Sequence, residues 1–252
     1  MRLRDKVTLV TGAASGFGEA MASLFAAEGA SVLVVDIDGS AAEEVASTIS
    51  TLGHTAQAFE ADVTKRTAIA AAIEQAEIAF GPLDTLVNNA GIAQANKSML
   101  EVGEADFDRI FEVNVKAIYL AALEAVPRFR RHGGGCILNT SSTAAISPRP
   151  GLTWYNASKG AVNTLTKSMA VELAPDNIRV NAVCPVIGET GLLETFMGKP
   201  DSPETRAPYI AGIPLGRMSK PIDVARAALY LVSDEAEFIT GVTLEVDGGR
   251  CV

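Results

Sequence analysis

Short runs rich in β-branched residues alternate with Ala-rich stretches of helical length along almost the whole chain. The runs predict seven strands, at residues 7–10, 31–36, 56–63, 85–91, 136–142, 178–185 and 243–249. The stretches between them predict amphipathic helices, at residues 18–28, 40–52, 65–80, 104–129, 157–173 and 222–232. This alternation is typical of right-handed βαβ crossovers. The predicted fold is therefore α/β and doubly wound, a seven-stranded parallel sheet with helices on both faces.

No linker rich in Pro, Gly or Ser and no internal repeat divides the chain, so residues 1–252 are predicted to form a single domain. One long region, residues 186–216, is rich in Pro and Gly and is predicted to be irregular. Loops of this length are usually functional, so we expect a substrate lid here, with a plain surface excursion as the alternative.

The balance of charge excludes several classes of function. The chain has a formal charge of -9 and a sequence pI of about 4.8, whereas nucleic acids and anionic membranes are bound by clustered Lys and Arg. No apolar stretch approaches the roughly 20 residues that cross a bilayer, and no apolar signal segment follows Met1, so a cytoplasmic protein is predicted. Three cysteines without a CxxC pair indicate neither a disulfide framework nor a metal site.

The first chemical signal is a glycine-rich turn, Thr11 to Gly18, directly after the first predicted strand. Its glycines, Gly12, Gly16 and Gly18, permit a tight turn and a close approach of the backbone to a phosphate. The helix that begins here would direct its N-terminus at that phosphate. The turn therefore predicts a dinucleotide site of the Rossmann type, although glycine is also the ordinary residue of turns.

Asp36 ends the second predicted strand, where an acidic side chain can accept hydrogen bonds from an adenosine ribose. A carboxylate there would repel the 2′-phosphate of NADP, and Ala14, Ser15 and Ile37 supply no basic partner for it. The sequence therefore favours NAD as the cofactor. The alternative for Asp36 is a helix N-cap or a turn residue.

A second signal is the pair Tyr155 and Lys159, which stand four residues apart on one helical face. A phenol near pKa 10 is a poor acid or base at neutral pH, and a neighbouring ammonium group is expected to lower its pKa. Ser142 lies at the end of an earlier strand, where its hydroxyl can contact the same substrate oxygen. Asn114 lies inside a helical run, which Asn disfavours, so a structural or relay role for its amide is expected.

Together these motifs resemble the short-chain dehydrogenase/reductase family, in its compact single-domain branch. The resemblance spans the chain and includes the glycine turn, Asn88 to Gly91, Asp247 to Gly249, and the set Asn114, Ser142, Tyr155 and Lys159. It implies that Tyr155 is the general acid and base, that Lys159 lowers its pKa and binds the nicotinamide ribose, and that Ser142 orients the substrate oxygen. It also implies that Asn114 holds a water in a proton relay to Lys159.

The resemblance further implies the cofactor contacts. Asp62 and Val63 match adenine contacts, and Thr190 matches the nicotinamide carboxamide contact. The full expected set is Gly12, Ser15, Gly16, Phe17, Gly18, Asp36, Ile37, Asp62, Val63, Asn89, Ala90, Gly91, Tyr155, Lys159, Pro185, Ile187 and Thr190. One position departs from the family pattern, because Val186 follows Pro185 where Gly is usual. A β-branched residue is strained at positive φ, so the local backbone is expected to differ there.

The resulting hypothesis is an NAD-dependent oxidoreductase that interconverts a secondary alcohol, or a sugar or polyol hydroxyl, and the ketone. One alternative is a 3-oxoacyl-carrier-protein reductase using NADPH, against which Asp36 argues, and another is a catalytically silent dinucleotide-binding sensor. The partner is a small-molecule substrate, and the family resemblance implies a homotetramer. The substrate stays open. Apolar side chains of the predicted lid (Leu192, Leu193, Phe196, Met197, Tyr209) and charged ones (Glu189, Glu194, Arg206) are equally able to face it.

Overall fold

A computed structural model describes all 252 residues. Seven parallel strands form one sheet in the order β3-β2-β1-β4-β5-β6-β7. Their bounds are β1 (Val7–Thr11), β2 (Ser31–Asp36), β3 (Ala56–Glu60), β4 (Thr85–Asn88), β5 (Gly135–Thr140), β6 (Ile178–Pro185) and β7 (Thr243–Val246). The predicted seven-stranded parallel sheet is therefore confirmed.

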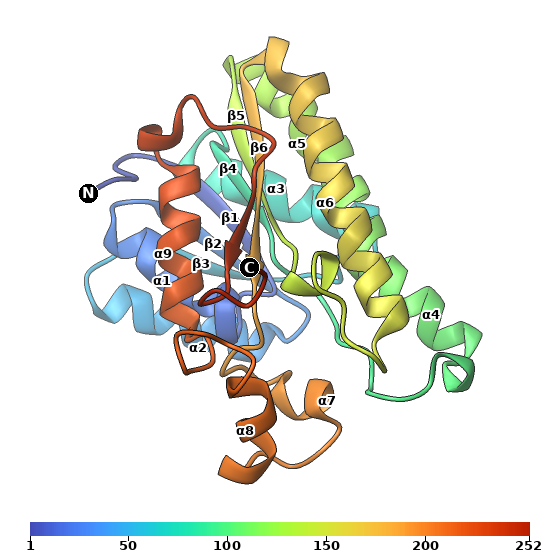
Figure 1. Ribbon diagram of the computed structural model, residues 1–252. Coiled ribbons are helices and arrows are strands. Elements are labelled where there is room, and N and C mark those ends of the chain that lie inside the picture. The colour runs from blue at the N-terminus through green and yellow to red at the C-terminus, as the bar shows by residue number, and fades with distance from the viewer.

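Helices cover both faces of the sheet (Figure 1). One face packs against α1 (Gly16–Ala27), α2 (Gly39–Thr51) and α9 (Pro221–Val232). The other face packs against α3 (Arg66–Phe80), α5 (Ala117–His132) and α6 (Thr153–Leu173). The shorter α4 (Glu104–Phe111) precedes α5 and also lies on this second face.

Each face has its own hydrophobic core, and the central strands contribute to both. In β2, for example, Val32 and Val34 face the first core, whereas Leu33 and Val35 face the second. Side chains alternate across a strand, so burial on both faces requires the continuous apolar runs seen in the sequence.

From β1 the chain adds β2 and β3 on one side, and it then crosses to add β4 on the other side of β1. The order of the strands therefore reverses between β1 and β4. In open α/β sheets, ligands bind outside the carboxyl ends of the strands at such a switch point. The glycine turn follows β1, and Asn89 follows β4, so both signals lie at this position.

Two helical predictions need correction. The stretch predicted as one helix over residues 104–129 is α4, a short π-helical segment (Glu112–Lys116) and α5, which continues to His132. Helix α6 begins at Thr153, four residues before the predicted start, so it includes both Tyr155 and Lys159. The π-helical segment contains Asn114, the residue whose presence in a helix was unexpected, and such bulges often occur at functional sites.

The predicted irregular region, residues 186–216, contains two helices, α7 (Leu193–Met197) and α8 (Pro203–Ile210). Figure 1 shows them projecting beyond the carboxyl end of β6. Pro203 occupies the first turn of α8, and the Ser202 hydroxyl accepts a hydrogen bond from the Thr205 amide, so proline and serine begin this helix rather than prevent it. No helix in the chain is long and apolar enough to span a membrane.

Candidate active site

The glycine turn between β1 and α1 is shaped by close backbone approaches. Gly12 has φ +61°, and a Cβ atom there would lie 2.7 Å from the Ala90 Cα. A Cβ on Gly18 would lie 2.0 Å from the Gly12 carbonyl oxygen. Both positions therefore require glycine, Gly12 by conformation and contact and Gly18 by contact alone.

Asn89 and Thr11 connect the end of β4 to this turn. The Asn89 Nδ2 donates to the Thr11 carbonyl at 3.0 Å and to the Gly12 carbonyl at 2.9 Å. The Thr11 Oγ1 accepts from the amides of Asn89 and Ala90 at 3.0 and 3.1 Å. These bonds fix the turn against β4. Ser15, the N-cap residue of α1, makes no capping hydrogen bond, so its side chain leaves the first amides of the helix free.

Asp36 lies beside the turn at the end of β2. Its Oδ2 accepts from the Ala14 amide at 3.0 Å and its Oδ1 from the Asp38 amide at 3.1 Å. The N-cap of α2 is Asp38, whose side chain accepts from the Ala41 amide, so the N-cap alternative for Asp36 is wrong.

A cavity of about 880 Å³ opens along the carboxyl ends of the strands. It brings together almost every residue predicted for the site: Gly12, Ser15, Gly16, Phe17, Asp36, Ile37, Asp62, Val63, Asn89, Ala90, Gly91, Ser142, Tyr155, Lys159, Pro185, Ile187 and Thr190. Two predicted residues lie outside its lining, namely Gly18, which packs α1 on the turn, and Asn114.

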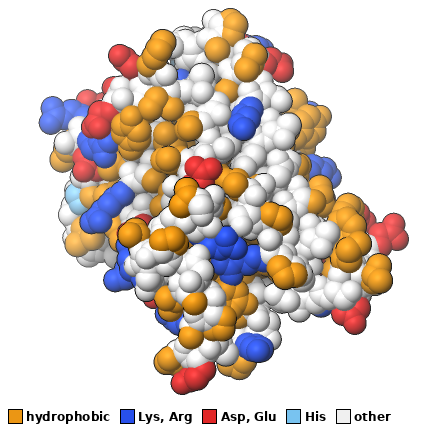
Figure 2. Space-filling model, in the orientation of Figure 1, with side chains coloured by type: hydrophobic (Ala, Val, Ile, Leu, Met, Phe, Trp, Pro, Cys, Tyr) orange, Lys and Arg blue, Asp and Glu red, His pale blue; other side chains and the backbone are white.

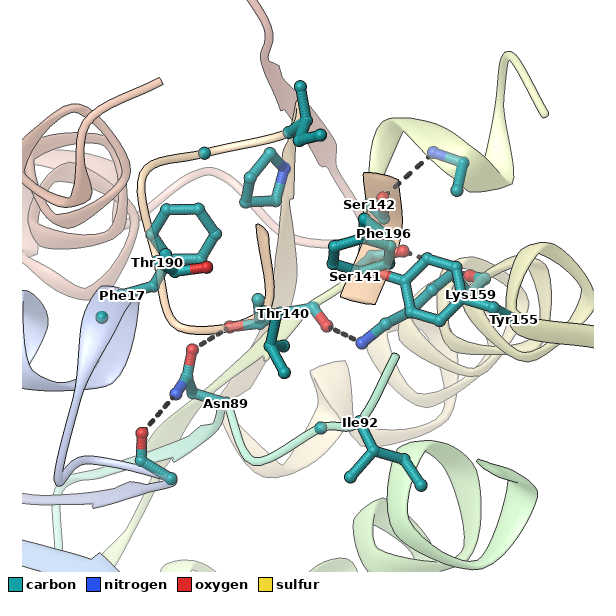
Figure 3. Close-up of a pocket in the computed structure, with 18 of the residues that line it drawn as sticks. Phe17, Asn89, Ile92, Thr140, Ser141, Ser142, Tyr155, Lys159, Thr190 and Phe196 are labelled. Atoms are coloured by element: carbon teal, nitrogen blue, oxygen red, sulfur yellow. Dashed lines mark hydrogen bonds between the residues drawn. The ribbon is translucent and has the colours of Figure 1, made fainter. Parts of the chain in front are cut away.

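Within this cavity Ser142, Tyr155 and Lys159 meet where β5 ends against α6 (Figure 3). The Lys159 Nζ donates to the Thr140 carbonyl at 2.9 Å and lies 5.8 Å from the centroid of the Tyr155 ring. The Ser141 hydroxyl donates to the Lys159 carbonyl at 3.1 Å and so joins the strand end to the helix. The three side chains therefore come together because the end of β5, which precedes Ser142, packs against the part of α6 that bears Tyr155 and Lys159.

Burial governs the pKa values of this pair. Burial raises the pKa of Tyr155 to about 12, and a hydrogen bond with Ser142 acts in the opposite direction. Burial also lowers the pKa of Lys159 to about 8. The lowered phenol pKa expected from Lys159 is therefore wrong for this structure, because the ammonium group is directed at the Thr140 carbonyl and loss of solvent outweighs the Ser142 bond.

Asn114 lies behind the cavity, in the π-helical segment. Its Oδ1 accepts from the Ile92 amide at 2.8 Å, and its Nδ2 donates to the Ile92 carbonyl and to Ser158 Oγ, each at 3.1 Å. A Cβ atom added to Gly91 would lie 3.2 Å from Asn114 Oδ1 and 3.5 Å from Lys159 Nζ. The amide oxygen and the amine therefore face the same small space beside Gly91.

The segment of residues 186–216 divides between the cavity and the protein body. Leu192, Phe196 and Tyr209 line the cavity, and the Phe196 ring meets the Tyr155 ring edge-on at 5.0 Å. Leu193 and Met197 instead pack against Met218. The charged alternatives do not line the cavity: Arg206 pairs with Glu189 and Asp201, and Glu194 accepts from the Asp201 amide.

Val186 is accommodated without strain. The non-glycine residues with positive φ are Asp5 and Asn177, so Val186 does not need the conformation that favours glycine. Its side chain is buried, and its amide donates to the Val246 carbonyl at 3.2 Å, which continues the pairing of β6 with β7.

Sequence reasoning missed several residues that line or support this site, among them Gln94, Arg149 and Arg250. Gln94 is buried, and its Oε1 accepts from the amides of Trp154 and Tyr155 at 3.0 and 3.1 Å, so a residue distant in sequence caps the start of α6. Arg149 and Arg250 also line the cavity. None belongs to a recognisable motif, and only the tertiary structure brings them to the site.

Comparison with known proteins places the chain in a family. A family model described as Enoyl-(Acyl carrier protein) reductase matches residues 12–250. A short-chain type dehydrogenase/reductase from Mycobacterium marinum has a similar structure, with a TM-score of 0.91 and 35% sequence identity, covering 98% of this chain and 96% of that one. This chain belongs to the short-chain dehydrogenase/reductase family.

Two further relatives show what kinds of enzyme the short-chain dehydrogenase/reductase resembles. The 4-formylbenzenesulfonate dehydrogenase of Comamonas testosteroni is 44% identical over 250 residues, 99% of each chain. The crystal structure of 3-ketoacyl-(acyl-carrier-protein) reductase from Brucella melitensis complexed with NADH is 48% identical, with a TM-score of 0.93, and covers 99% of this chain and 100% of that one. The protein is therefore an oxidoreductase of this family.

Proposed function

We propose that this protein is an NAD-dependent oxidoreductase that interconverts a secondary alcohol and the corresponding ketone. One observation carries the proposal: Ser142, Tyr155 and Lys159 line the same cavity as the glycine turn and Asp36. A protein that only bound a dinucleotide would have no chemical need for that trio. The cavity thus combines a cofactor site with a group able to move a proton.

The residues present fit NAD. The uncapped N-terminus of α1 and the glycine turn would hold the pyrophosphate, because free amides and the helix dipole favour an anion there. Asp36 would accept hydrogen bonds from the adenosine ribose, Asp62 and Val63 would border the adenine, and Thr190 would contact the carboxamide. The structure of the reductase from Brucella melitensis, which is complexed with NADH, supports the same choice. Bound NAD supplies the acceptor of the hydride that leaves the alcohol carbon.

In alcohol oxidation, Tyr155 would take the hydroxyl proton as the carbon loses its hydride, and in ketone reduction it would return that proton. Ser142 lines the cavity with Tyr155 and would hold the substrate oxygen beside the Tyr155 hydroxyl. Lys159, whose Nζ lies 5.8 Å from the centroid of the Tyr155 ring, would bind the nicotinamide ribose. Asn114 would hold a water near Gly91, from which a proton could reach the Lys159 amine.

The test is a turnover assay that follows the reduced-nicotinamide absorbance band. A panel of secondary alcohols, sugars and polyols is offered with NAD and, separately, with NADP. We expect turnover with NAD on at least one substrate class. A preference for NADP would contradict the role of Asp36, and silence with both cofactors despite measured NAD binding would favour the sensor.

The second candidate is a 3-oxoacyl-carrier-protein reductase. The relative from Brucella melitensis, a 3-ketoacyl-(acyl-carrier-protein) reductase whose structure is complexed with NADH, favours it, so the argument from Asp36 against this activity loses weight. Reduction of an acetoacetyl carrier protein far faster than of the free ketones would select this candidate.

We also propose the homotetramer implied by the family resemblance. Tyr119 and Leu123 on α5 and Val171 on α6 are exposed apolar side chains, which a symmetric contact through these helices would cover. Chromatography with light scattering tests this, and a stable monomer would contradict it. The cytoplasmic location stays a prediction.

A further inference from the structure

Three arginines line the cavity without forming an ion pair, namely Arg109, Arg149 and Arg250. The charge of Arg109 acts on Asp62 and helps to lower the pKa of that carboxyl group. This leaves Arg149 and Arg250. The ion pairs of the chain involve other arginines, namely Arg2, Arg66, Arg128, Arg130, Arg206 and Arg217. Arg149 and Arg250 form none of them. The acidic side chains that line the cavity are Asp36, which ends β2, and Asp62, which follows β3, both at the cofactor end. An acidic protein thus keeps the guanidinium groups of Arg149 and Arg250 without an ion pair in its cavity.

The neighbouring residues hold both arginines in place. The Arg149 guanidinium lies 4.8 Å from the centroid of the Tyr209 ring of α8, and its carbonyl accepts from Asn156 Nδ2 at 2.9 Å. The Arg250 Nη1 donates to the Ser147 hydroxyl at 2.8 Å. Arg250 also lies in a turn whose amides are bound by the Asp247 carboxylate. Figure 2 shows blue Lys and Arg atoms near the centre of the face where Figure 1 marks the C-terminus.

This arrangement is electrostatically unfavourable while the two arginines lack an anion. Burial and the neighbouring charge of Arg250 both lower the pKa of Arg149. An anionic ligand between the two groups would compensate both effects, and guanidinium groups bind oxyanions through paired hydrogen bonds.

Apolar side chains separate this cationic region from the chemistry. Leu152 lies between Arg149 and Tyr155 in the sequence and packs with Ala144 and the Tyr155 ring. Phe196 packs against the same cluster from α7. A ligand that reached from the arginines to Tyr155 would therefore need an apolar body.

We propose that Arg149 and Arg250 bind an oxyanion group, a carboxylate or a sulfonate, of the substrate whose alcohol or ketone carbon is placed at Tyr155. This inference rests on the proposed function, and it adds the class of substrate: an anionic head joined through an apolar body to a secondary alcohol or ketone.

The experiment titrates the NADH-loaded protein by calorimetry with three ketones of one shape. These are para-acetylbenzoate, para-acetylbenzenesulfonate and the neutral methyl ester of the first. We expect at least one of the two anions to bind about tenfold or more tightly than the ester, since hydrogen bonds to charged groups are the stronger ones. The anion that binds more tightly shows whether the head group is a carboxylate or a sulfonate.

Variants locate the effect. Arg149→Gln and Arg250→Gln should each weaken binding of the preferred anion about tenfold or more and leave the ester unchanged. Arg131→Gln, on the exposed end of α5, serves as a matched control and should change neither. The proposal would be overturned if the ester and the two anions bound with equal affinity. It would also be overturned if none of the three bound. So would an Arg149→Gln variant that weakens the ester as much as the anion.

The proposed function has separate readouts in the same samples, namely NADH affinity and NADH oxidation by each ketone. If the anion is preferred but no substrate of any class is turned over, the oxidoreductase proposal fails and the anion site stands. If the ester and other neutral ketones bind and are turned over as well as the anions, the anion-site proposal fails and the oxidoreductase proposal stands.

Discussion

At the level of single residues, burial decides the charge state of Lys159. Its Nζ has one hydrogen-bond acceptor in the protein, the Thr140 carbonyl, and its side chain is buried. Because burial disfavours the ammonium form, the folded protein carries an energetic cost that an apolar side chain would avoid. The buried ammonium group of Lys159, which lies near Tyr155, therefore lowers the free energy of unfolding.

Lys159→Met should therefore stabilise the protein without NAD at neutral pH. The pKa of Lys159 is lowered from 10.5 to about 8, which corresponds to about 3 kcal/mol, and loss of the Thr140 hydrogen bond offsets about 1 kcal/mol. Below pH 8 both folded and unfolded Lys159 are charged and the whole cost is present. Between pH 8 and 10.5 the unfolded chain binds more protons, so the wild type gains stability as pH rises.

Denaturant unfolding of both proteins between pH 7 and 10 measures this difference. We expect a gain of about 2 kcal/mol for Lys159→Met at pH 7 that shrinks as the pH approaches 10.5. Both proteins keep Tyr155, so the difference isolates Lys159. A gain that stays constant with pH would contradict the account.

The proposed preference for NAD rests on the charge of Asp36. Asp36→Asn keeps one oxygen to accept from the Ala14 or Asp38 amide but removes the charge, so the ratio of kcat/KM for NAD to that for NADP should fall about tenfold or more. Glu60→Gln, on the neighbouring strand and outside the cavity lining, is the control and should leave the ratio unchanged. An unchanged ratio in Asp36→Asn would mean that other residues select the cofactor.

The sequence revealed those site residues that lie close together along the chain, at a spacing that forms a pattern. Tyr155 and Lys159 are one helical turn apart, and Gly12 and Gly16 belong to one turn, so a pattern detects them. Gln94, Arg149 and Arg250 come from three separate loops and meet only after folding. The pKa direction of Tyr155 also escaped prediction, because burial cannot be read from a pair of residue types.

At the level of elements, the start of α6 sets the orientation of Tyr155. The Gln94 side chain accepts from the amides of Trp154 and Tyr155, and its Nε2 donates to the Gly151 carbonyl at 2.8 Å. Three hydrogen bonds from one buried side chain thus join the loop after β4 to the helix that bears the proton-transfer residue.

Gln94→Ala should leave these groups unsatisfied and cost about 2 kcal/mol in the free energy of unfolding. We expect kcat to fall while NADH affinity, which depends on distant contacts, is retained. Gln94→Glu should restore more of kcat than Ala does, because a carboxylate still accepts from both amides. Equal losses of kcat and NADH affinity would indicate a general structural defect instead.

The inner strands were predicted well because they are apolar runs buried on both faces, whereas the edge strands β3 and β7 are only partly buried and end before their predicted bounds. Helices α7 and α8 were not, because they have five and eight residues and include or adjoin Pro and Gly. Isolated helices so short are unstable, so their packing, such as Leu193 and Met197 on Met218, supplies the stability that local sequence lacks.

At the level of the whole molecule, one cavity joins segments from nearly the full length of the chain, from Gly12 to Arg250. A ligand that fills it binds the folded state alone. NADH at about a hundred times its Kd should therefore stabilise the protein by about 2.7 kcal/mol and raise Tm by roughly 5–10 °C. Differential scanning fluorimetry checks this, and an unchanged Tm would contradict the cofactor site.

The central claim is that Tyr155 moves the proton while the rest of the cavity holds NAD. The most direct test compares wild type and Tyr155→Phe in turnover with the best substrate and in NADH affinity by titration. The account predicts that turnover falls by about a thousandfold or more while NADH affinity stays within about twofold. A Tyr155→Phe variant that keeps wild-type turnover would contradict it.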